Sequence, residues 1–190
     1  MENPTITVVS GLPRSGTSMM MRMLESGGLT VLTDRERRAD DDNPKGYFEF
    51  ERVKKLKDDK AWLPEAVGKV VKIISFLLPE VLPEYHYRVV FINRHLDEVL
   101  ASQRQMLVRR GEATDKVSDD RMRDLYGKHL TQVRRWLKEQ PNIDVLYVEH
   151  RDVIEKPGDV AEAVNAFLGG ALDVAKMTAA VDPKLHRQRA

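Results

Sequence analysis

The sequence predicts a three-layer α/β/α fold with a central parallel sheet. Short segments rich in β-branched residues alternate with helical patterns along the chain. These short segments are apolar on both faces, which is typical of parallel strands that are covered by helices on either side. We expect residues 1–190 to form a single domain, because a chain of 190 residues is long enough to bury one core.

The first expected unit consists of a strand, a turn and a helix. Residues 6–10 (ITVVS) are mostly β-branched and end before Gly11, which predicts a short strand. Residues 18–26 contain no helix-breaking residue and stop at Gly27, which predicts a helix. A second apolar run, Leu29–Leu32, is expected to form the next strand.

The remaining elements continue the alternation. Residues 33–45 are charged, show no period and contain Asn43-Pro44, so we expect a loop there. Apolar side chains at spacings of three and four predict the later helices, the longest of which is capped by Ser118. The later strands are expected at residues 69–74, 87–92 and 144–148, and the later helices at residues 96–110, 117–140 and 158–168.

The composition excludes several classes of protein. With 31 Lys and Arg against 30 Asp and Glu, the formal net charge of +1 predicts no nucleic-acid or membrane partner, so any anion is bound locally. The chain has no cysteine, which excludes disulfides, thiolate metal sites and a cysteine nucleophile. No apolar run approaches the roughly 18 residues of a membrane span, and no leader-like segment opens the chain. We expect a cytoplasmic protein, and its oligomeric state is left open.

The turn between the first strand and the first helix carries the strongest functional signal. Residues 11–18 (GLPRSGTS) match the phosphate-binding pattern G-x-x-x-x-G-K-[ST], except that Thr17 replaces the lysine. In such a turn several backbone N–H groups point into one concavity at the positive end of a helix, which suits a phosphate or sulfate group. Arg14 adds a permanent cation, and Thr17 and Ser18 add hydroxyl groups.

The same region is poorly suited to ATP hydrolysis. Enzymes of that type use the loop lysine on the phosphates and an aspartate at the end of a second strand to hold Mg²⁺. Here the lysine is Thr17, and the strand at 87–92 runs into Asn93-Arg94. A cation in this place favours a donor with two separate anionic ends, and we expect no metal.

Two motifs resemble those of the sulfotransferases that use 3′-phosphoadenosine 5′-phosphosulfate (PAPS). Residues 13–18 (PRSGTS) resemble the family's P-[KR]-[ST]-G-[ST]-[ST] loop, in the arginine form of tyrosylprotein and many bacterial enzymes. Arg94 and Ser102 are eight residues apart, as in the family's R-N-P-x-D-V-x-x-S motif, whose acid we match to Asp97. A weaker similarity covers residues 145–168, so the resemblance extends over most of the chain.

The resemblance implies a P-loop nucleoside triphosphate hydrolase-like fold of the sulfotransferase type. It implies transfer of a sulfuryl group from PAPS to a hydroxyl or amine acceptor, with adenosine 3′,5′-bisphosphate (PAP) as product and no metal. Arg94 and Ser102 are expected to bind the 3′-phosphate. The expected ligands of the 5′-phosphosulfate are Pro13, Arg14, Ser15, Gly16, Thr17 and Ser18.

The chain departs from the family at three places. Cytosolic animal enzymes have a catalytic histidine two residues after a strand lysine, whereas here Lys72 is followed by Ile74 in that position. Lys72 is still a candidate for contact with the transferred group. Met19 replaces the adenine-stacking aromatic residue, and the family's R-K-G loop is missing, so Arg187 or Arg189 is expected to assist at the 3′-phosphate.

For the base that accepts the proton of the acceptor, the resemblance implies a carboxylate. Relatives with the arginine loop use one about twenty residues beyond that arginine, and Asp34 lies twenty residues beyond Arg14. Asp34 also follows the apolar run Leu29–Leu32, which places it at the carboxyl end of a strand, where α/β folds keep their sites. Glu36 is the second candidate and Glu49 the third.

Two other functions stay open from the sequence. One is an ATP-dependent P-loop phosphotransferase, and the other is a non-catalytic nucleotide-binding protein of the same fold. The acceptor of a sulfotransferase is open as well, since a small molecule, a saccharide or a peptide fits the sequence equally.

Overall fold

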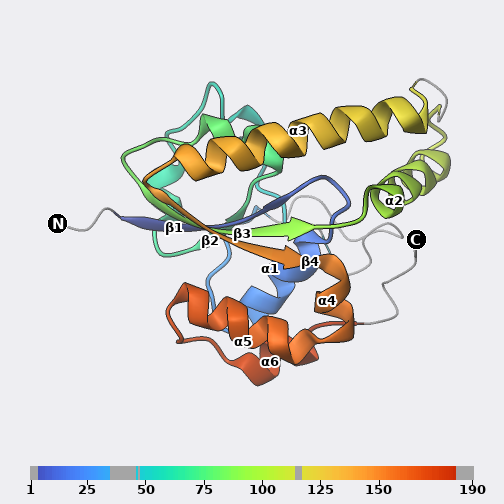
Figure 1. The fold of residues 1–190 in the computed structure, drawn as a ribbon. Coiled ribbons are helices and arrows are strands. Elements are labelled where there is room, and N and C mark those ends of the chain that lie inside the picture. Colours follow the sequence, from blue (N-terminus) through green and yellow to red (C-terminus); the bar gives the residue numbers. More distant parts are fainter. Residues whose placement is uncertain (1–3, 35–45, 47, 114–116, 183–190) are drawn as a thin grey trace.

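The central sheet has four parallel strands in the order β2-β1-β3-β4 (Figure 1). The computed structural model describes residues 4–34, 46, 48–113 and 117–182. The parallel sheet and the α/β class predicted from the sequence are confirmed. The strands are β1 (Thr5–Gly11), β2 (Val70–Lys72), β3 (His86–Asn93) and β4 (Ile143–Glu149).

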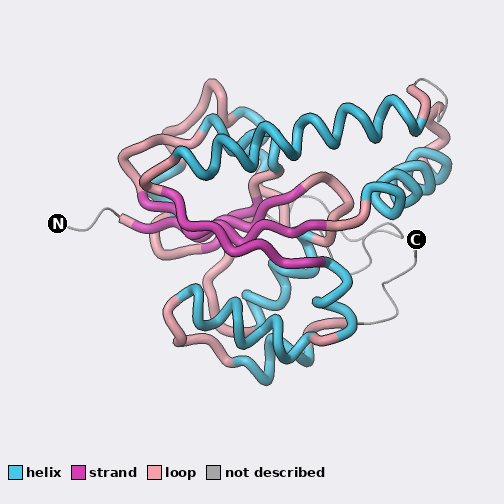
Figure 2. Tube along the Cα trace, in the orientation of Figure 1, coloured by secondary structure: helices cyan, strands magenta, loops and turns pink. Residues whose placement is uncertain are grey.

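Helices cover both faces of this sheet, which gives the three expected layers (Figure 2). The long helix α3 (Asp119–Glu139) lies over one face, and α1 (Thr17–Ser26), α5 (Pro157–Leu168) and α6 (Val174–Ala179) lie over the other (Figure 1). Successive strand residues face opposite layers: Val8 belongs to the core beneath α3, and Val9 to the core beneath α1. The helix α2 (Leu96–Arg109) follows the carboxyl end of β3.

Short helices account for most of the elements that the sequence pattern missed. They are α4 (His150–Glu155), α6, and the 3₁₀ segments η1 (Glu51–Lys55), η2 (Leu63–Ala66) and η3 (Ser75–Glu80). With six residues or fewer each, these segments are too short to show a helical period.

The strand expected at Leu29–Leu32 is largely wrong. Only Val31 pairs there, through one isolated parallel bridge to Val70. The neighbouring strand β2 has only three residues, so few of its backbone groups are available to pair with residues 29–32. The segment nevertheless runs beside the sheet, with the Leu32 N–H donating to the Val70 carbonyl at 2.8 Å. Asp34 therefore follows a bridge rather than a full strand.

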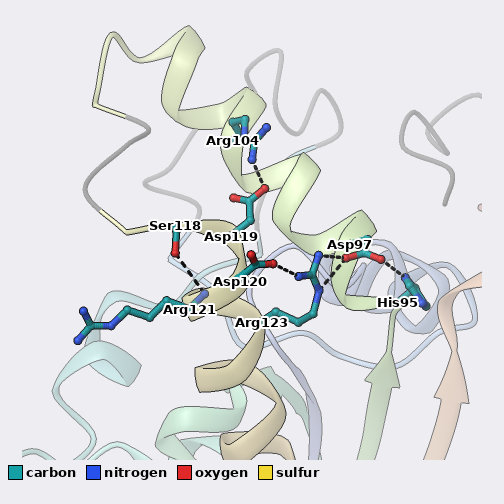
Figure 3. A network of polar contacts seen from close by, with 8 residues as sticks. All are labelled: His95, Asp97, Arg104, Ser118, Asp119, Asp120, Arg121 and Arg123. Atoms are coloured by element: carbon teal, nitrogen blue, oxygen red, sulfur yellow. Dashed lines mark hydrogen bonds and ion pairs between the residues drawn. The ribbon is translucent and has the colours of Figure 1, made fainter.

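The two helices α2 and α3 are joined by polar contacts at their exposed ends (Figure 3). Ser118 caps α3 as predicted, with its Oγ accepting from the Arg121 N–H at 3.4 Å. Arg123 of α3 donates from Nε to Asp97 of α2 at 3.0 Å and from Nη1 to Asp120 at 2.6 Å. None of the helices in the described part of the chain combines the length and apolar character that crossing a bilayer requires.

Candidate active site

The turn between β1 and α1 has the backbone of an anion-binding turn. Gly16 caps α1 in the left-handed region, with a φ of 100°, and Arg14 lies there too at 68°. Glycine is required at position 16 for a second reason, because a Cβ atom would lie 2.6 Å from the His150 side chain. A Cβ at Gly11 would likewise meet Ser15 Oγ at 2.5 Å. The turn is therefore packed too closely for side chains at either glycine.

Two buried hydroxyl groups at this turn suit an anionic ligand. Ser10 and Ser15 are 0% and 1% exposed, and neither Oγ atom has a hydrogen-bond partner within the described ranges. A buried hydroxyl without a partner is unfavourable by about 1–3 kcal/mol. Backbone N–H groups at the amino end of α1 also point toward the turn and carry the positive end of the helix dipole. A phosphate or sulfate oxygen satisfies both kinds of donor, so the residues present fit such a group.

The remaining loop residues lie in the turn and at the start of the first helix. Pro13 is partly buried in the turn, Thr17 is the first residue of α1 and is 8% exposed, and Ser18 follows it. The loop predicted at residues 13–18 therefore starts within the turn and continues into the first helical turn.

The two motifs identified in the sequence are in direct contact. Arg14 Nε donates to Ser102 Oγ at 3.1 Å, and Arg94 Nη1 donates to the Arg14 carbonyl at 2.9 Å. The sheet produces this contact, because β1 and β3 are neighbours and Gly11 pairs with Ile92. The turn after β1 and the helix after β3 thus begin side by side.

Glu98 is the acid that holds Arg94, which corrects the match to Asp97. Glu98 Oε2 accepts from Arg94 Nε at 2.8 Å, and the two side chains are 12% and 8% exposed. Asp97 instead binds Arg123, whose hydrogen bond lowers the pKa of the Asp97 carboxyl. In the motif R-N-P-x-D-V the acid stands four residues after the arginine, so counting from Arg94 leads to Glu98. Arg94 comes just before α2 and reaches Glu98 in the first turn of that helix, whereas Asp97 points toward α3.

His150 is a member of the site that the sequence did not indicate. It begins α4 directly after β4, and its side chain is 7% exposed. Its ring packs against Gly16 and its Nδ1 lies 4.0 Å from Glu98 Oε2. A single histidine without a spacing partner carries no signal in the sequence, and only the closeness of β4 to β3 brings it here.

The candidate carboxylates differ in what they contact. Asp34 Oδ2 accepts from the Glu51 N–H at 2.6 Å, at the start of η1. Glu49 Oε1 lies 3.8 Å from Lys72 Nζ at the end of β2, and Glu49 Oε2 lies 3.5 Å from Lys54 Nζ. Glu36 lies outside the described residues, as do Arg187 and Arg189.

A family model for the sulfotransferase domain matches residues 4–184. This chain belongs to the sulfotransferase family. The matched residues include the turn, Arg94, Ser102 and every described carboxylate candidate. Among curated proteins no match was found.

Solved structures of two sulfotransferases and of retinol dehydratase share the fold of this family member. The sulfotransferase from Alicyclobacillus acidocaldarius is 16% identical with a TM-score of 0.56, over 97% of this chain and 88% of that one. The sulfotransferase domain of the curacin biosynthetic pathway is 13% identical with a TM-score of 0.57, over 96% and 79%. Retinol dehydratase, solved with androsterone and the inactive cofactor PAP, is 13% identical with a TM-score of 0.51, over 95% and 64%. The P-loop-like fold predicted for this sulfotransferase is confirmed.

Proposed function

We propose that this chain transfers a sulfuryl group from PAPS to a hydroxyl or amine acceptor and releases PAP. The observation that carries the proposal is the contact of Arg14 with Ser102, supported by the bond from Arg94 to the Arg14 carbonyl. It brings a cradle for one anion beside a second cationic site. A nucleotide with separate 5′- and 3′-anionic groups is a ligand that needs both.

Different residues bind the two anionic ends of PAPS in this proposal. The 5′-phosphosulfate is bound by the N–H groups of the turn, Ser15 and the hydroxyls of Thr17 and Ser18. Arg94 and Ser102 bind the 3′-phosphate. PAP is present in the solved structure of retinol dehydratase, a protein of similar fold.

Arg14 is suited to the charge that develops during transfer. The acceptor oxygen forms a bond to sulfur, the bond from sulfur to the bridging oxygen breaks, and its electron pair stays on the 5′-phosphate of PAP. Arg14 stabilises that developing negative charge, because a guanidinium keeps its proton and donates several hydrogen bonds. The proton of the acceptor passes to a carboxylate, for which Asp34, Glu36 and Glu49 are the candidates.

One protein of this fold has been solved with two different small molecules, which supports a small-molecule acceptor. Solved complexes of retinol dehydratase contain retinol or androsterone. A saccharide or peptide acceptor is compatible with the same donor site. We propose that the whole chain acts as one domain and that the transfer needs no metal.

Calorimetric titration with PAP and with Mg-ATP tests the donor class. PAP is expected to bind more tightly than Mg-ATP, and R94A is expected to weaken PAP binding at least tenfold. Arg121 provides the matched control, because its exposed guanidinium points away from the polar cluster at the ends of α2 and α3 (Figure 3). R121A should bind PAP as the wild type does. Preference for Mg-ATP, or an R94A variant with unchanged PAP affinity, contradicts the proposal.

A screen of phenols, alcohols, sugars and peptides with labelled PAPS tests the reaction itself. Label is expected to appear in at least one acceptor class, in step with release of PAP. Tight PAP binding without transfer to any acceptor would favour the non-catalytic alternative.

A further inference from the structure

A pair of opposite charges lies at the carboxyl end of β2. Lys72 Nζ and Glu49 Oε1 are 3.8 Å apart, with side-chain exposures of 9% and 17%. Lys72 pairs with Val9 of β1, and Val9 comes two residues before the first glycine of the anion-binding turn. The pair and the turn therefore occupy the same edge of the sheet, where parallel α/β folds place their chemistry.

The pair also lies on the same face of the sheet as α1. Val70 belongs to the core beneath α1 and Val71 to the core beneath α3, so alternation along the strand directs Lys72 toward the α1 face. The residue before Glu49 contacts that helix, because Arg22 of α1 lies over the Phe48 ring at 5.9 Å from its centroid. Arg22 is one helical turn beyond Ser18 of the anion-binding loop.

The backbone around Glu49 is fixed by several contacts. Thr33 Oγ1 donates to the Glu49 carbonyl at 2.7 Å, and the Asp34 N–H donates to the same carbonyl at 3.4 Å. Phe48 has a φ of 51°, in the left-handed region that a bulky residue adopts only when its surroundings impose it. Strained backbone of this kind is enriched at functional sites.

Asp34 is engaged in the same segment. Its Oδ2 accepts from the Glu51 N–H at 2.6 Å, which stabilises the start of η1 two residues after Glu49. An asparagine oxygen at this position accepts the same bond, so this role requires a hydrogen-bond acceptor and not a negative charge.

We infer that Glu49 receives the proton of the acceptor and that Asp34 is a positioning residue for Glu49. The inference rests on the proposed function and assigns the base between its two described candidates, Asp34 and Glu49. Lys72, 3.8 Å from Glu49 Oε1, orients the Glu49 carboxylate. In the reaction the acceptor hydroxyl loses its proton to the Glu49 carboxylate as its oxygen bonds to sulfur. The bond from sulfur to the bridging oxygen breaks, and its electron pair stays on the 5′-phosphate of PAP.

The test compares E49Q, D34N and D34A in transfer from labelled PAPS to the best acceptor of the screen. E49Q is expected to lower kcat about a hundredfold or more and to leave PAP affinity unchanged. The wild type should lose kcat at acidic pH as the base becomes protonated, and E49Q should lack this acidic limb. D34N is expected to keep kcat within a few fold of the wild type, whereas D34A lowers it. E65Q is the control. It removes the charge of Glu65, which lies in η2 with a side chain that is 58% exposed, and it should leave kcat unchanged.

The outcomes separate this inference from the proposed function. An active wild type with an equally active E49Q overturns the inference alone, as does a D34N variant that loses as much activity as E49Q. A wild type that transfers no sulfuryl group to any acceptor overturns the proposed function and the inference together. Circular dichroism and thermal melts of each variant identify any loss that comes from unfolding.

Discussion

Arg14 Nε donates a hydrogen bond to Ser102 Oγ at 3.1 Å, between residues 88 positions apart in the chain. The bond joins the turn that follows β1 to the second turn of α2. Both groups are proposed to bind the donor, Arg14 at the 5′ end and Ser102 at the 3′ end. The site is thus assembled with its two halves already in contact.

Replacing the serine tests this contact. S102A is expected to bind PAP about tenfold more weakly, because it removes a hydroxyl that accepts from Arg14 and is proposed to bind the 3′-phosphate. Ser102 is 9% exposed and alanine fits in its place, so the fold should persist. Calorimetry at fixed salt measures the change. Ser26 is the last residue of α1, at the opposite end of that helix from the turn, so S26A is the control. Equal affinities of S102A and the wild type would contradict the proposed role.

The close packing of the turn predicts an unusually sensitive glycine. G16A is expected to lower the free energy of unfolding by more than about 2 kcal/mol and to abolish PAP binding, since its Cβ would lie 2.6 Å from His150. Gly28 has a similar φ, 102° against 100°, but nothing lies within 4 Å of its Cβ position. G28A should therefore show only the backbone strain, about 1 kcal/mol. Urea unfolding measures the free energy of unfolding that each variant loses. Equal losses in G16A and G28A would contradict the predicted effect of packing at Gly16.

Two ion pairs with the same spacing and distance should contribute differently to the free energy of unfolding, because only one of them is buried. Glu98 accepts from Arg94 Nε and Glu155 from Arg151 Nε, each at 2.8 Å and at the i,i+4 spacing. The first pair is 8% and 12% exposed, and the second is 76% and 46% exposed. E98A is expected to lower the free energy of unfolding by about 3 kcal/mol, because it leaves a buried guanidinium without its carboxylate.

The exposed pair is the control for this prediction. E155A should change the free energy of unfolding only slightly, as is usual for pairs in contact with water. Chemical denaturation compares the two, and similar values for E98A and E155A would show that Glu98 does not stabilise Arg94.

His129 predicts a dependence of stability on pH. Burial lowers the pKa of His129 from its usual 6.5, and its Nε2 lies 2.8 Å from Ser75 Oγ. The unfolded chain therefore binds a proton at a higher pH than the folded chain does, so stability falls as the pH decreases below about 6.5. Urea midpoints at about pH 7.5 and about pH 5.5 should differ less for H129Q than for the wild type. H95Q, at a 63% exposed histidine, is the control and should behave like the wild type.

The elements with strong local patterns could be predicted well. The β-branched run before Gly11, the apolar segments at β3 and β4, and the cap at Ser118 depend on neighbours in sequence, and the structure places them within a few residues of the expected bounds. The strand expected at Leu29–Leu32 was reduced to one bridge, because pairing depends on the length of β2 beside it. Local apolarity says nothing about the length of a neighbouring strand.

The sequence by itself determined the anion-binding turn, the spacing of Arg94 and Ser102, and the lack of a histidine two residues after Lys72. These features are set by residue type and by distances along one strand or one helix. The tertiary structure alone decided that Arg14 meets Ser102, that His150 packs against Gly16 and that Glu49 meets Lys72. Each of these contacts depends on the order β2-β1-β3-β4 or on which face of a helix is buried. The spacing of residues along the chain encodes neither the strand order nor the buried helix face, because the sheet brings together segments that are far apart in the sequence.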